Sequence, residues 1–469
     1  MSRKKSFIIN LIIISFGTVL PRLASFITLP ILTAELTKKE YGMHDNITTL
    51  VSLFLPVVTL QIQTAAFRFL IDYRGDEKKT NQVLSNIICF VIPISIVSLG
   101  ILYLCMFKID PLLRLVICLY FYFDIMLRTL QQIVRGMSNN KLYSVSSVLE
   151  SLLNLGLVVA TVKMGKMGLM GVIISVAVAD FIAVVLILAR ENIFRRIKFS
   201  YVSKKMLKEM LAYSWPMIPN ALSIWVLKFS DRMVLTLCWG TATNAIYAAA
   251  TKIPSVLNVI QNSFTFAWQE NASIVSEDED AERYYSNMFD SIYTFLAGML
   301  ALLIAATPIM FKILIKGNYE EAYYQMPILF MGTFFSCITA FLGGIYVAKK
   351  KTKSVGITTV VCAAINLAID LLFVKQIRVY AASISTLVSY MALAIFRMID
   401  VQKFQKIEYN IRKIVFYLAV LSGMCVLCFI NNFYINILNF VIGCVFALIT
   451  NRKMITGMLK MIKKKRVKA

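Results

Sequence analysis

Three charged residues stand in the middle of an otherwise apolar stretch, "WVLKFSDRMVLTLCWG", residues 225–240. In a helix, Lys228 and Arg232 lie one turn apart on a single face, with Asp231 beside them. Charges in hydrocarbon cost about 2.5 to 3.5 kcal/mol each, so they normally face a wet cavity or a partner. One carboxylate neutralises only one of the two cations. This helix face is therefore predicted to line a cavity that binds an anion, and a guanidinium suits the paired oxygens of a phosphate.

Further cations occupy other apolar runs. Arg22 and Lys252 have no acidic neighbour in their own predicted helices, and shifting the chain by 206 residues places Arg22 on Lys228. The alternative is a set of ion pairs that only holds helices together. We predict a phosphate-binding set with two supporting residues: Arg22, Lys228, Arg232 and Lys252, supported by Asp231 and Arg68.

Intramembrane carboxyl groups are the other candidates for chemistry. Asp124 and Arg128 are four residues apart and are predicted to form an ion pair. Glu150 and Asp180, together with Asp124, are candidates to bind a coupling proton or sodium ion, and structural hydrogen bonding is the alternative. No metal site or cofactor is expected, because the sequence has a single histidine and its nine cysteines lie in apolar runs as small fillers.

The composition of the chain indicates which kind of helix carries these charged residues. Hydrophobic residues make up 59% of the 469 residues and charged residues only 16%, which is typical of a multi-span membrane protein. The net charge of +24 comes from short basic clusters between apolar runs, a pattern that argues against nucleic-acid binding. We predict about 14 transmembrane helices, which begin near Phe7, Asn46, Gln82, Pro111, Tyr143, Gly168, Tyr213, Asn244, Met288, Ala322, Ser354, Val379, Ile414 and Tyr434.

The distribution of basic residues predicts the orientation. If the amino terminus is cytoplasmic, 35 of the 49 Lys and Arg residues fall in inside connections and 10 in outside connections. The positive-inside rule then places both termini in the cytoplasm. The segment 190–211 mixes basic and apolar residues as an interfacial helix does, and the tail "MIKKKRVKA" is predicted to be a basic cytoplasmic tail.

A weak internal repeat predicts two lobes. A shift of 212 residues places Asn154 on Asn366, and a shift of 206 places Tyr41 on Tyr247. Six spans separate the copies, so two parallel six-helix lobes would enclose a central cavity. The predicted domains are an N-lobe with spans 1–6 (residues 1–189), an amphipathic cytoplasmic linker (190–211), a C-lobe with spans 7–12 (212–398) and a final helix pair with the basic tail (399–469).

Several segments resemble one protein family. "ITLPILTAELTKKEYGMHDNITTL", "AYSWPMIPNALSIWVLKFSDRMVL", "IYAAATKI" with "FAWQE", and "AINLAIDLLFV" followed by "FRMID" are similar to the Wzx-type polysaccharide flippases of the multidrug, oligosaccharidyl-lipid and polysaccharide exporter superfamily. The resemblance covers nearly the whole chain. It implies a monomeric protein of the bacterial inner membrane, whose substrate is an undecaprenyl-pyrophosphate-linked oligosaccharide and whose further partners are membrane lipids and polysaccharide polymerase or chain-length machinery. The last helix pair resembles the extra pair of the related peptidoglycan-precursor flippases.

The expected function is flipping of lipid-linked repeat units for O-antigen or capsule by alternating access, with the cavity cations holding the pyrophosphate. A cation-coupled drug exporter of the same fold is the nearest alternative, but it would favour a net acidic cavity. A membrane-embedded polymerase is the alternative from another class. It would need a sizeable outward loop with catalytic residues, whereas every predicted outward loop has about a dozen residues or fewer. The chain is therefore not expected to be an enzyme.

Overall fold

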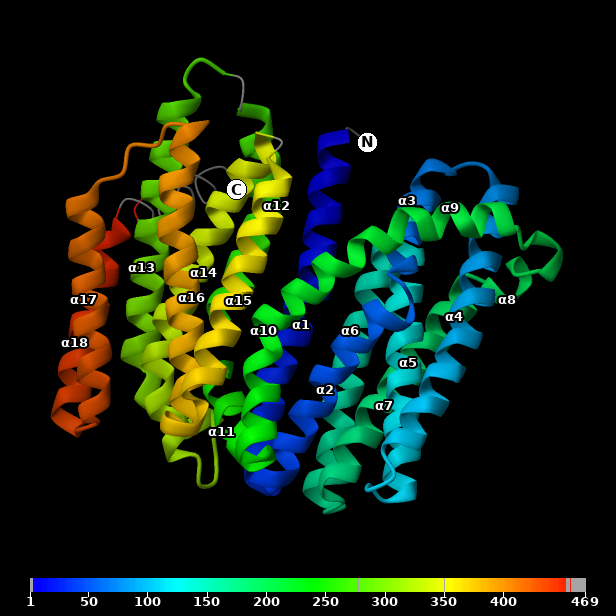
Figure 1. Cartoon of the computed structure of the whole chain (residues 1–469), viewed down its shortest axis with the longest axis horizontal. Coiled ribbons are helices and arrows are strands. Elements are labelled where there is room, and N and C mark those ends of the chain that lie inside the picture. Colours follow the sequence, from blue (N-terminus) through cyan, green and yellow to red (C-terminus); the bar gives the residue numbers. More distant parts are fainter. Residues whose placement is uncertain (1–2, 276–277, 350, 453–455, 457–469) are drawn as a thin grey trace, which may run out of the picture. The chain divides into compact units, whose positions relative to one another are not determined.

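The structure is a computed structural model that describes residues 3–275, 278–349, 351–452 and 456. In this part of the chain all regular structure is helical (Figure 1), as the sequence predicts. The predicted basic tail, residues 461–469, lies outside the described residues. The chain divides into two compact units, Met1–Phe229 and Ser230–Ala469, here called unit 1 and unit 2, and the boundary falls inside one long helix.

In unit 1, α1 packs on α6, α5 and α6 pack on α7, and α3 packs on α5. Fully buried Ile, Leu and Val side chains of α3, α4, α5 and α7 form its main core. The helices are α1 (Arg3–Glu35), α2 (Lys38–Val58), α3 (Ile62–Asp72), α4 (Glu77–Cys105), α5 (Pro111–Gly136), α6 (Asn140–Val158) with a π-turn (Val159–Met164), α7 (Gly168–Arg190), α8 (Ile193–Arg196), α9 (Lys204–Ser214) and α10 (Ile218–Trp239), which continues into unit 2.

In unit 2, α14 packs on α16, α12 and α11, and α15 packs on α16. The last helix pair packs on α13. The helices are α11 (Thr241–Lys252), α12 (Ser255–Val275), α13 (Ala281–Leu314), α14 (Glu320–Ala348), α15 (Thr352–Ile377), α16 (Val379–Asp400), α17 (Ile411–Ile430) and α18 (Phe433–Thr450).

Short polar residues fix where several helices begin. Thr37 caps α2 in a capping box with Glu40, and Asp110, Asn139 and Asn410 accept backbone hydrogen bonds at the starts of α5, α6 and α17. Such caps satisfy N–H groups that have no partner inside the helix, which matters most near lipid.

The span formed by α2 and α3 in unit 1 is broken. Between α2 and α3 the chain bends by 57°, and Leu60 and Gln61 there adopt positive φ angles of 48° and 59°. The backbone oxygen of Leu60 accepts a 2.8 Å hydrogen bond from Ser214 Oγ, so the break is held within unit 1. In unit 2, α11 ends at Lys252 and α12 begins at Ser255.

Helices occupy all the predicted span positions, but the predicted count of 14 stays a prediction. Among the described residues, ten helices are long and apolar enough to cross a membrane, or eleven with the bent pair α2 and α3. Charged side chains interrupt the apolar sequences of α5 and α10, and α11 is short. Large apolar side chains are exposed along single helices, as on α4 with Ile96, Val97, Ile101 and Leu104, which is typical of a surface that faces lipid. The protein is a multi-pass membrane protein.

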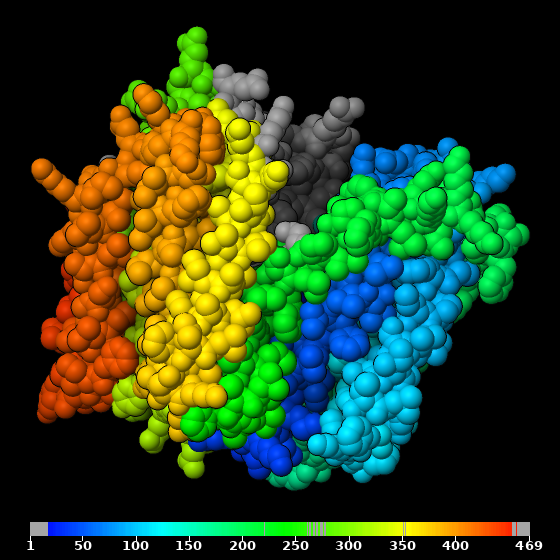
Figure 2. Space-filling model, in the orientation of Figure 1, coloured from blue at the N-terminus to red at the C-terminus, as the bar shows by residue number. Residues whose placement is uncertain are grey.

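The segment 190–211, predicted as a linker, packs on unit 1. Its helices α8 and α9 contact α4, and α9 also packs on α3. Figure 2 shows this green segment lying over the blue helices of unit 1. The backbone N–H groups of Lys198 and Ser203 donate to Ser85 Oγ (3.2 Å) and Asn86 Oδ1 (3.1 Å) on α4. Side chains of α4 therefore hold the segment in place.

Candidate functional site

Two of the predicted phosphate-binding cations lie in unit 1. Arg22 is half-buried on α1, directly after Pro21, and Lys228 is exposed on α10. The two like charges act on each other electrostatically, so the structure brings their side chains into the same neighbourhood. Neither side chain forms an ion pair with any residue that the structure describes. Unit 1 therefore presents a cationic pair that an anion can neutralise.

The position of Lys228 is set by a tryptophan one turn earlier. The indole N–H of Trp225 donates to the backbone oxygen of Thr49 and to Ser52 Oγ, both at 3.1 Å. These bonds tie the first half of α10 to α2. The helix therefore presents Lys228 from a fixed backbone.

The other two predicted cations lie in unit 2. Arg232 Nη2 donates to Thr251 Oγ1 at 3.4 Å, and Lys252 follows as the last residue of α11. Both cations are half-buried. The start of unit 2 thus brings Arg232 next to the end of α11.

Arg68, predicted as a supporting residue, lies at the surface. It forms a 3.1 Å ion pair with Asp72 one turn later on α3, and both side chains are about half exposed. Such exposed pairs contribute little to stability. Its charge is already neutralised locally, so Arg68 is the natural control for the other cations.

Asp231 faces the interior of unit 2. Its Oδ2 accepts hydrogen bonds from Tyr247 at 2.7 Å and from Thr386 at 2.8 Å. The Asp370 carboxyl group on α15 lies within hydrogen-bond reach of the Asp231 carboxyl group. We call Asp231, Tyr247, Asp370 and Thr386 the carboxyl pair cluster.

Neutral polar groups complete this cluster. Ser385 Oγ donates to Asp370 Oδ1 at 3.1 Å, and Asn366 Nδ2 donates to Ser385 Oγ at 3.2 Å. The remaining oxygens, Asp231 Oδ1 and Asp370 Oδ2, receive no hydrogen bond from the described groups. Sequence reasoning missed Asp370 and Thr386. The one available signal was Asp370 in "AINLAID", four residues after Asn366 and therefore on the same helix face.

Unit 1 has a different acidic cluster. Arg128 Nε donates to Asp124 Oδ1 at 3.0 Å, so the predicted ion pair is confirmed. Asp180 on α7 is 1% exposed, and neither of its carboxyl oxygens has a hydrogen-bond partner among the described residues. Glu150 on α6 is half-buried and acts electrostatically on both Arg128 and Asp180. We call Asp124, Arg128, Glu150 and Asp180 the mixed-charge cluster.

Both clusters have chemistry suited to a proton or a hard monovalent cation. Two buried carboxyl groups that face each other are not both ionised without a counter-charge, so such a pair holds a proton or a cation between them. Their ligand atoms are all oxygens, which suits sodium better than a transition metal. Groups of three or more His, Cys, Asp and Glu placed to hold a metal ion do not occur in the described ranges.

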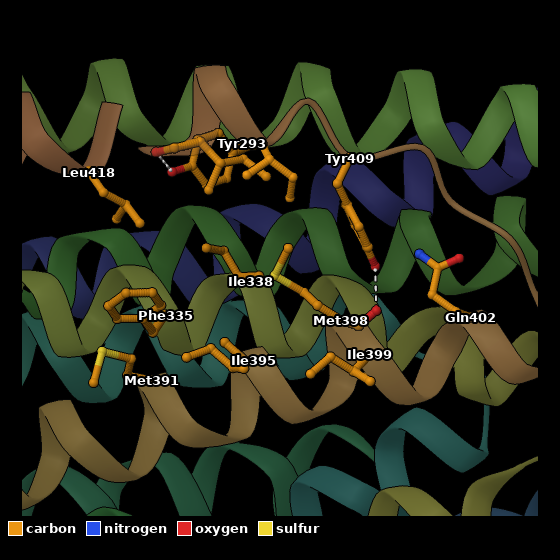
Figure 3. A pocket seen from close by; sticks show the side chains of 13 residues that line it. Tyr293, Phe335, Ile338, Met391, Ile395, Met398, Ile399, Gln402, Tyr409 and Leu418 are labelled. Carbon is orange, nitrogen blue, oxygen red and sulfur yellow. Dashed lines mark hydrogen bonds between the residues drawn. The ribbon is translucent and has the colours of Figure 1, made fainter. Parts of the chain in front are cut away.

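An apolar pocket of about 540 Å³ lies between α17 and the body of unit 2. Figure 3 shows aliphatic, thioether and aromatic side chains lining it from α13, α14 and α16, with Leu418 from α17. The hydroxyls of Tyr293 and Tyr409 donate to the backbone oxygens of Ile414 (3.0 Å) and Met398 (3.2 Å), so these polar tips are already satisfied. The pocket therefore suits a hydrocarbon chain.

Solved structures similar to this chain are membrane transporters and flippases. The lipid II flippase MurJ in an inward closed conformation matches with a TM-score of 0.73 at 14% identity, over 96% of this chain and 100% of that one. An inward-facing multidrug resistance MATE transporter of the MOP superfamily matches with a TM-score of 0.63 at 12% identity, over 82% and 98%. A MOP superfamily transporter from Pyrococcus furiosus matches with 0.57 at 15%, over 86% and 96%. These likenesses define the fold class: an all-α membrane protein with the MurJ and MATE fold.

The family follows from the sequence. The family model described as "Polysaccharide biosynthesis protein" matches residues 7–269, which is more than half of the chain. The chain therefore belongs to the polysaccharide biosynthesis protein family, and the resemblance to flippases of the exporter superfamily is confirmed. No curated protein matches the sequence.

Proposed function

We propose that this protein is a flippase that moves polyprenyl-pyrophosphate-linked oligosaccharide repeat units from the cytoplasmic to the outer leaflet of the bacterial inner membrane, for O-antigen or capsule synthesis. The observation that carries this proposal is the pair Arg22 and Lys228, two cations of unit 1 without an ionic partner among the described residues. A pyrophosphate supplies the missing negative charge, and hydrogen bonds between cationic side chains and phosphate oxygens are stronger than those between neutral groups. Arg232 and Lys252 are proposed as further pyrophosphate contacts.

The proposal also assigns a place to the polyprenyl chain and to the oligosaccharide of the substrate. The polyprenyl chain lies against the apolar pocket of unit 2, which has the composition of a hydrocarbon site. The oligosaccharide occupies the wet space that the cations face. Transport proceeds by alternating access, in which two lobes rock so that a binding site opens to each side in turn. The matched family description and the fold of the lipid II flippase support this substrate class.

A second candidate function is cation-coupled export of a small molecule. The two carboxyl clusters favour it, since intramembrane carboxyl groups often bind a coupling ion. In the flippase proposal the same clusters couple transport to a proton or sodium gradient. The two candidates therefore differ in substrate and share the coupling groups.

The lipid-linked intermediates of the native cell distinguish the two. Deletion of the gene in a strain with an intact polymerase should cause single repeat units on polyprenyl pyrophosphate to accumulate in the inner leaflet. Unchanged lipid-linked intermediates, with increased drug sensitivity instead, would favour the exporter. The wild-type gene and a gene carrying Arg68→Gln should both restore export, which controls for expression.

A further inference from the structure

A polar cavity of about 690 Å³ lies where α4 begins and the segment 190–211 crosses it. All its lining residues belong to unit 1. Lys78 comes from α4, Arg195 and Arg196 from α8, and Lys198 from the turn that follows. Glu77 is the only acidic residue among those that line the cavity. The cavity wall therefore has a large excess of positive charge.

The positive charge is not neutralised within the protein. None of the four cations forms an ion pair with a residue in the described ranges. The acidic residue nearest to α8 in sequence, Glu191, accepts a 2.7 Å hydrogen bond from Asn139 instead. Lys198 Nζ lies 5.6 Å from the centre of the Tyr201 ring, which is a weak partner compared with a carboxylate. The cavity thus attracts an anion.

The cavity is built by ordered contacts. Ile193 in α8 is fully buried in the core of unit 1. The N–H of Lys198 is bound by Ser85 Oγ, and Ser85 is fully buried. Asn81 Oδ1, in the cavity wall, has no hydrogen-bond partner among the described groups. The backbone that presents these cations is therefore held in place by buried contacts.

The flanking residues indicate that the anion belongs to a lipid. Phe194 and Phe199 come from the same segment as the cations and are 73% and 87% exposed. Exposed aromatic side chains next to basic residues at the end of membrane helices are typical of the interface between lipid headgroups and acyl chains. A soluble phosphate would make no use of these two side chains.

We propose that this cavity binds the phosphate headgroup of an anionic phospholipid, with Phe194 and Phe199 against its acyl chains. The lipid would come from the leaflet at the α4 amino-terminal end of unit 1. This site is separate from the flippase substrate site and does not depend on the proposed substrate. It would attach the segment 190–211 to that leaflet.

The test measures the thermal unfolding midpoint of the full chain in neutral detergent. Phosphatidylglycerol, phosphatidylcholine and inorganic phosphate are titrated separately. A ligand that binds the folded state raises the midpoint with concentration. We expect a saturable rise with phosphatidylglycerol and none with the other two.

Two triple variants remove the same number of charges from the same segment. Arg195→Gln with Arg196→Gln and Lys198→Gln removes three of the four cavity cations and leaves Lys78, whereas Lys204→Gln with Lys205→Gln and Lys208→Gln changes exposed residues of α9 outside the cavity. The cavity variant should bind phosphatidylglycerol about tenfold more weakly or worse, and the control within about twofold of wild type. An equal loss in both variants would mean diffuse surface attraction and would overturn the proposal.

The remaining outcomes are also decisive. A rise with inorganic phosphate equal to that with phosphatidylglycerol would assign the cavity to free phosphate instead of lipid. An equal rise with phosphatidylcholine would mean that the headgroup charge is irrelevant. Phe199→Ala keeps all the cations, and it should weaken binding of phosphatidylglycerol if the acyl chains contribute. Phe199→Ala also tests the lipid site if the triple variant unfolds.

Discussion

In unit 1, Asp124 has Arg128 as a partner one turn away on its own helix, whereas in unit 2 Asp231 faces the carboxyl group of Asp370 on a different helix. The first arrangement supplies its own counter-charge. The second supplies only hydroxyl groups to the carboxylates, from residues such as Tyr247. A buried carboxyl pair without a cation must take up a proton or a metal ion from outside. The difference indicates that unit 2 holds the better site for an exchangeable ion.

Within unit 1, the cations are used in two different ways. Arg22 and Lys228 of unit 1 have no ionic partner in the described part of the chain, whereas Arg128 of the same unit is paired. Unit 1 therefore has a surplus of positive charge at one place and an internal balance at another. In the proposed function, the surplus binds the substrate and the carboxyl groups bind the coupling ion.

The largest expected effect comes from removing that surplus. Arg22→Gln or Lys228→Gln should reduce export about tenfold or more, because a hydrogen bond between a cation and a phosphate contributes about 1.5 to 3 kcal/mol. Lys228→Arg should retain partial function, since the charge remains although its donor geometry changes. Surface polysaccharide is measured at equal membrane levels of each protein. Full export by both glutamine variants would remove the substrate-binding role of the pair.

The next effect concerns the coupling ion. Asp370→Asn should abolish the response of transport to proton and sodium gradients, because an amide cannot exchange a proton or balance a cation. Asp180→Asn should lower the response less, since Asp124 and Glu150 stay in its cluster. Transport by both variants is measured in vesicles with an imposed proton or sodium gradient. A response that survives Asp370→Asn and disappears with Asp180→Asn would reverse the assignment of the two units.

A smaller effect is expected on stability. Asp124→Asn breaks the ion pair with Arg128 and should lower the free energy of unfolding by about 1 to 2 kcal/mol, since the arginine is partly exposed. Asp370→Asn removes repulsion between two carboxyl groups and should leave stability unchanged or raised. Thermal unfolding in detergent compares the two variants at one pH. If Asp370→Asn destabilised the protein more, a bound cation would be holding the pair together.

The last prediction concerns orientation in the membrane, and its cysteine variants should have the smallest effect on function. A cysteine at Ala242, an exposed position in the first turn of α11, should react with an impermeant reagent from outside, and a cysteine at Lys198 should not. The exposed Cys238 is replaced by serine to remove its signal, and the exposed Cys105 at the end of α4 serves as the outside reference for unit 1. Labelling at Lys198 alone would reverse the proposed orientation.

Sequence patterns predicted the elements better than their contacts. The pair of Asp124 and Arg128 was predictable because both residues lie on one helix four positions apart. Asp370 was not, because its partner Asp231 lies 139 residues earlier and helical periodicity does not tell which helices meet.

Breaks in the helices were equally hard to predict from the sequence. The bend at Leu60 and Gln61 occurs at residues that rarely adopt positive φ, so no glycine marks it in the sequence. Conversely, α1 runs without a break through Pro21 and Pro30, although each proline removes a backbone hydrogen bond of the helix. Pro216, by contrast, lies in a short 3-10 segment, Trp215–Met217, just before α10 begins.

Reconstituted transport tests the central claim most directly. Purified protein is placed in liposomes with a labelled polyprenyl-pyrophosphate oligosaccharide, and a membrane-impermeant reagent reports how fast the headgroup changes leaflet. The wild type and Arg68→Gln should flip the lipid, and the double variant Arg22→Gln with Lys228→Gln should fall to the rate of protein-free liposomes. Equal flipping by the double variant would show that this cationic pair does not bind the pyrophosphate. No flipping by the wild type, under gradients of either ion, would contradict the flippase proposal.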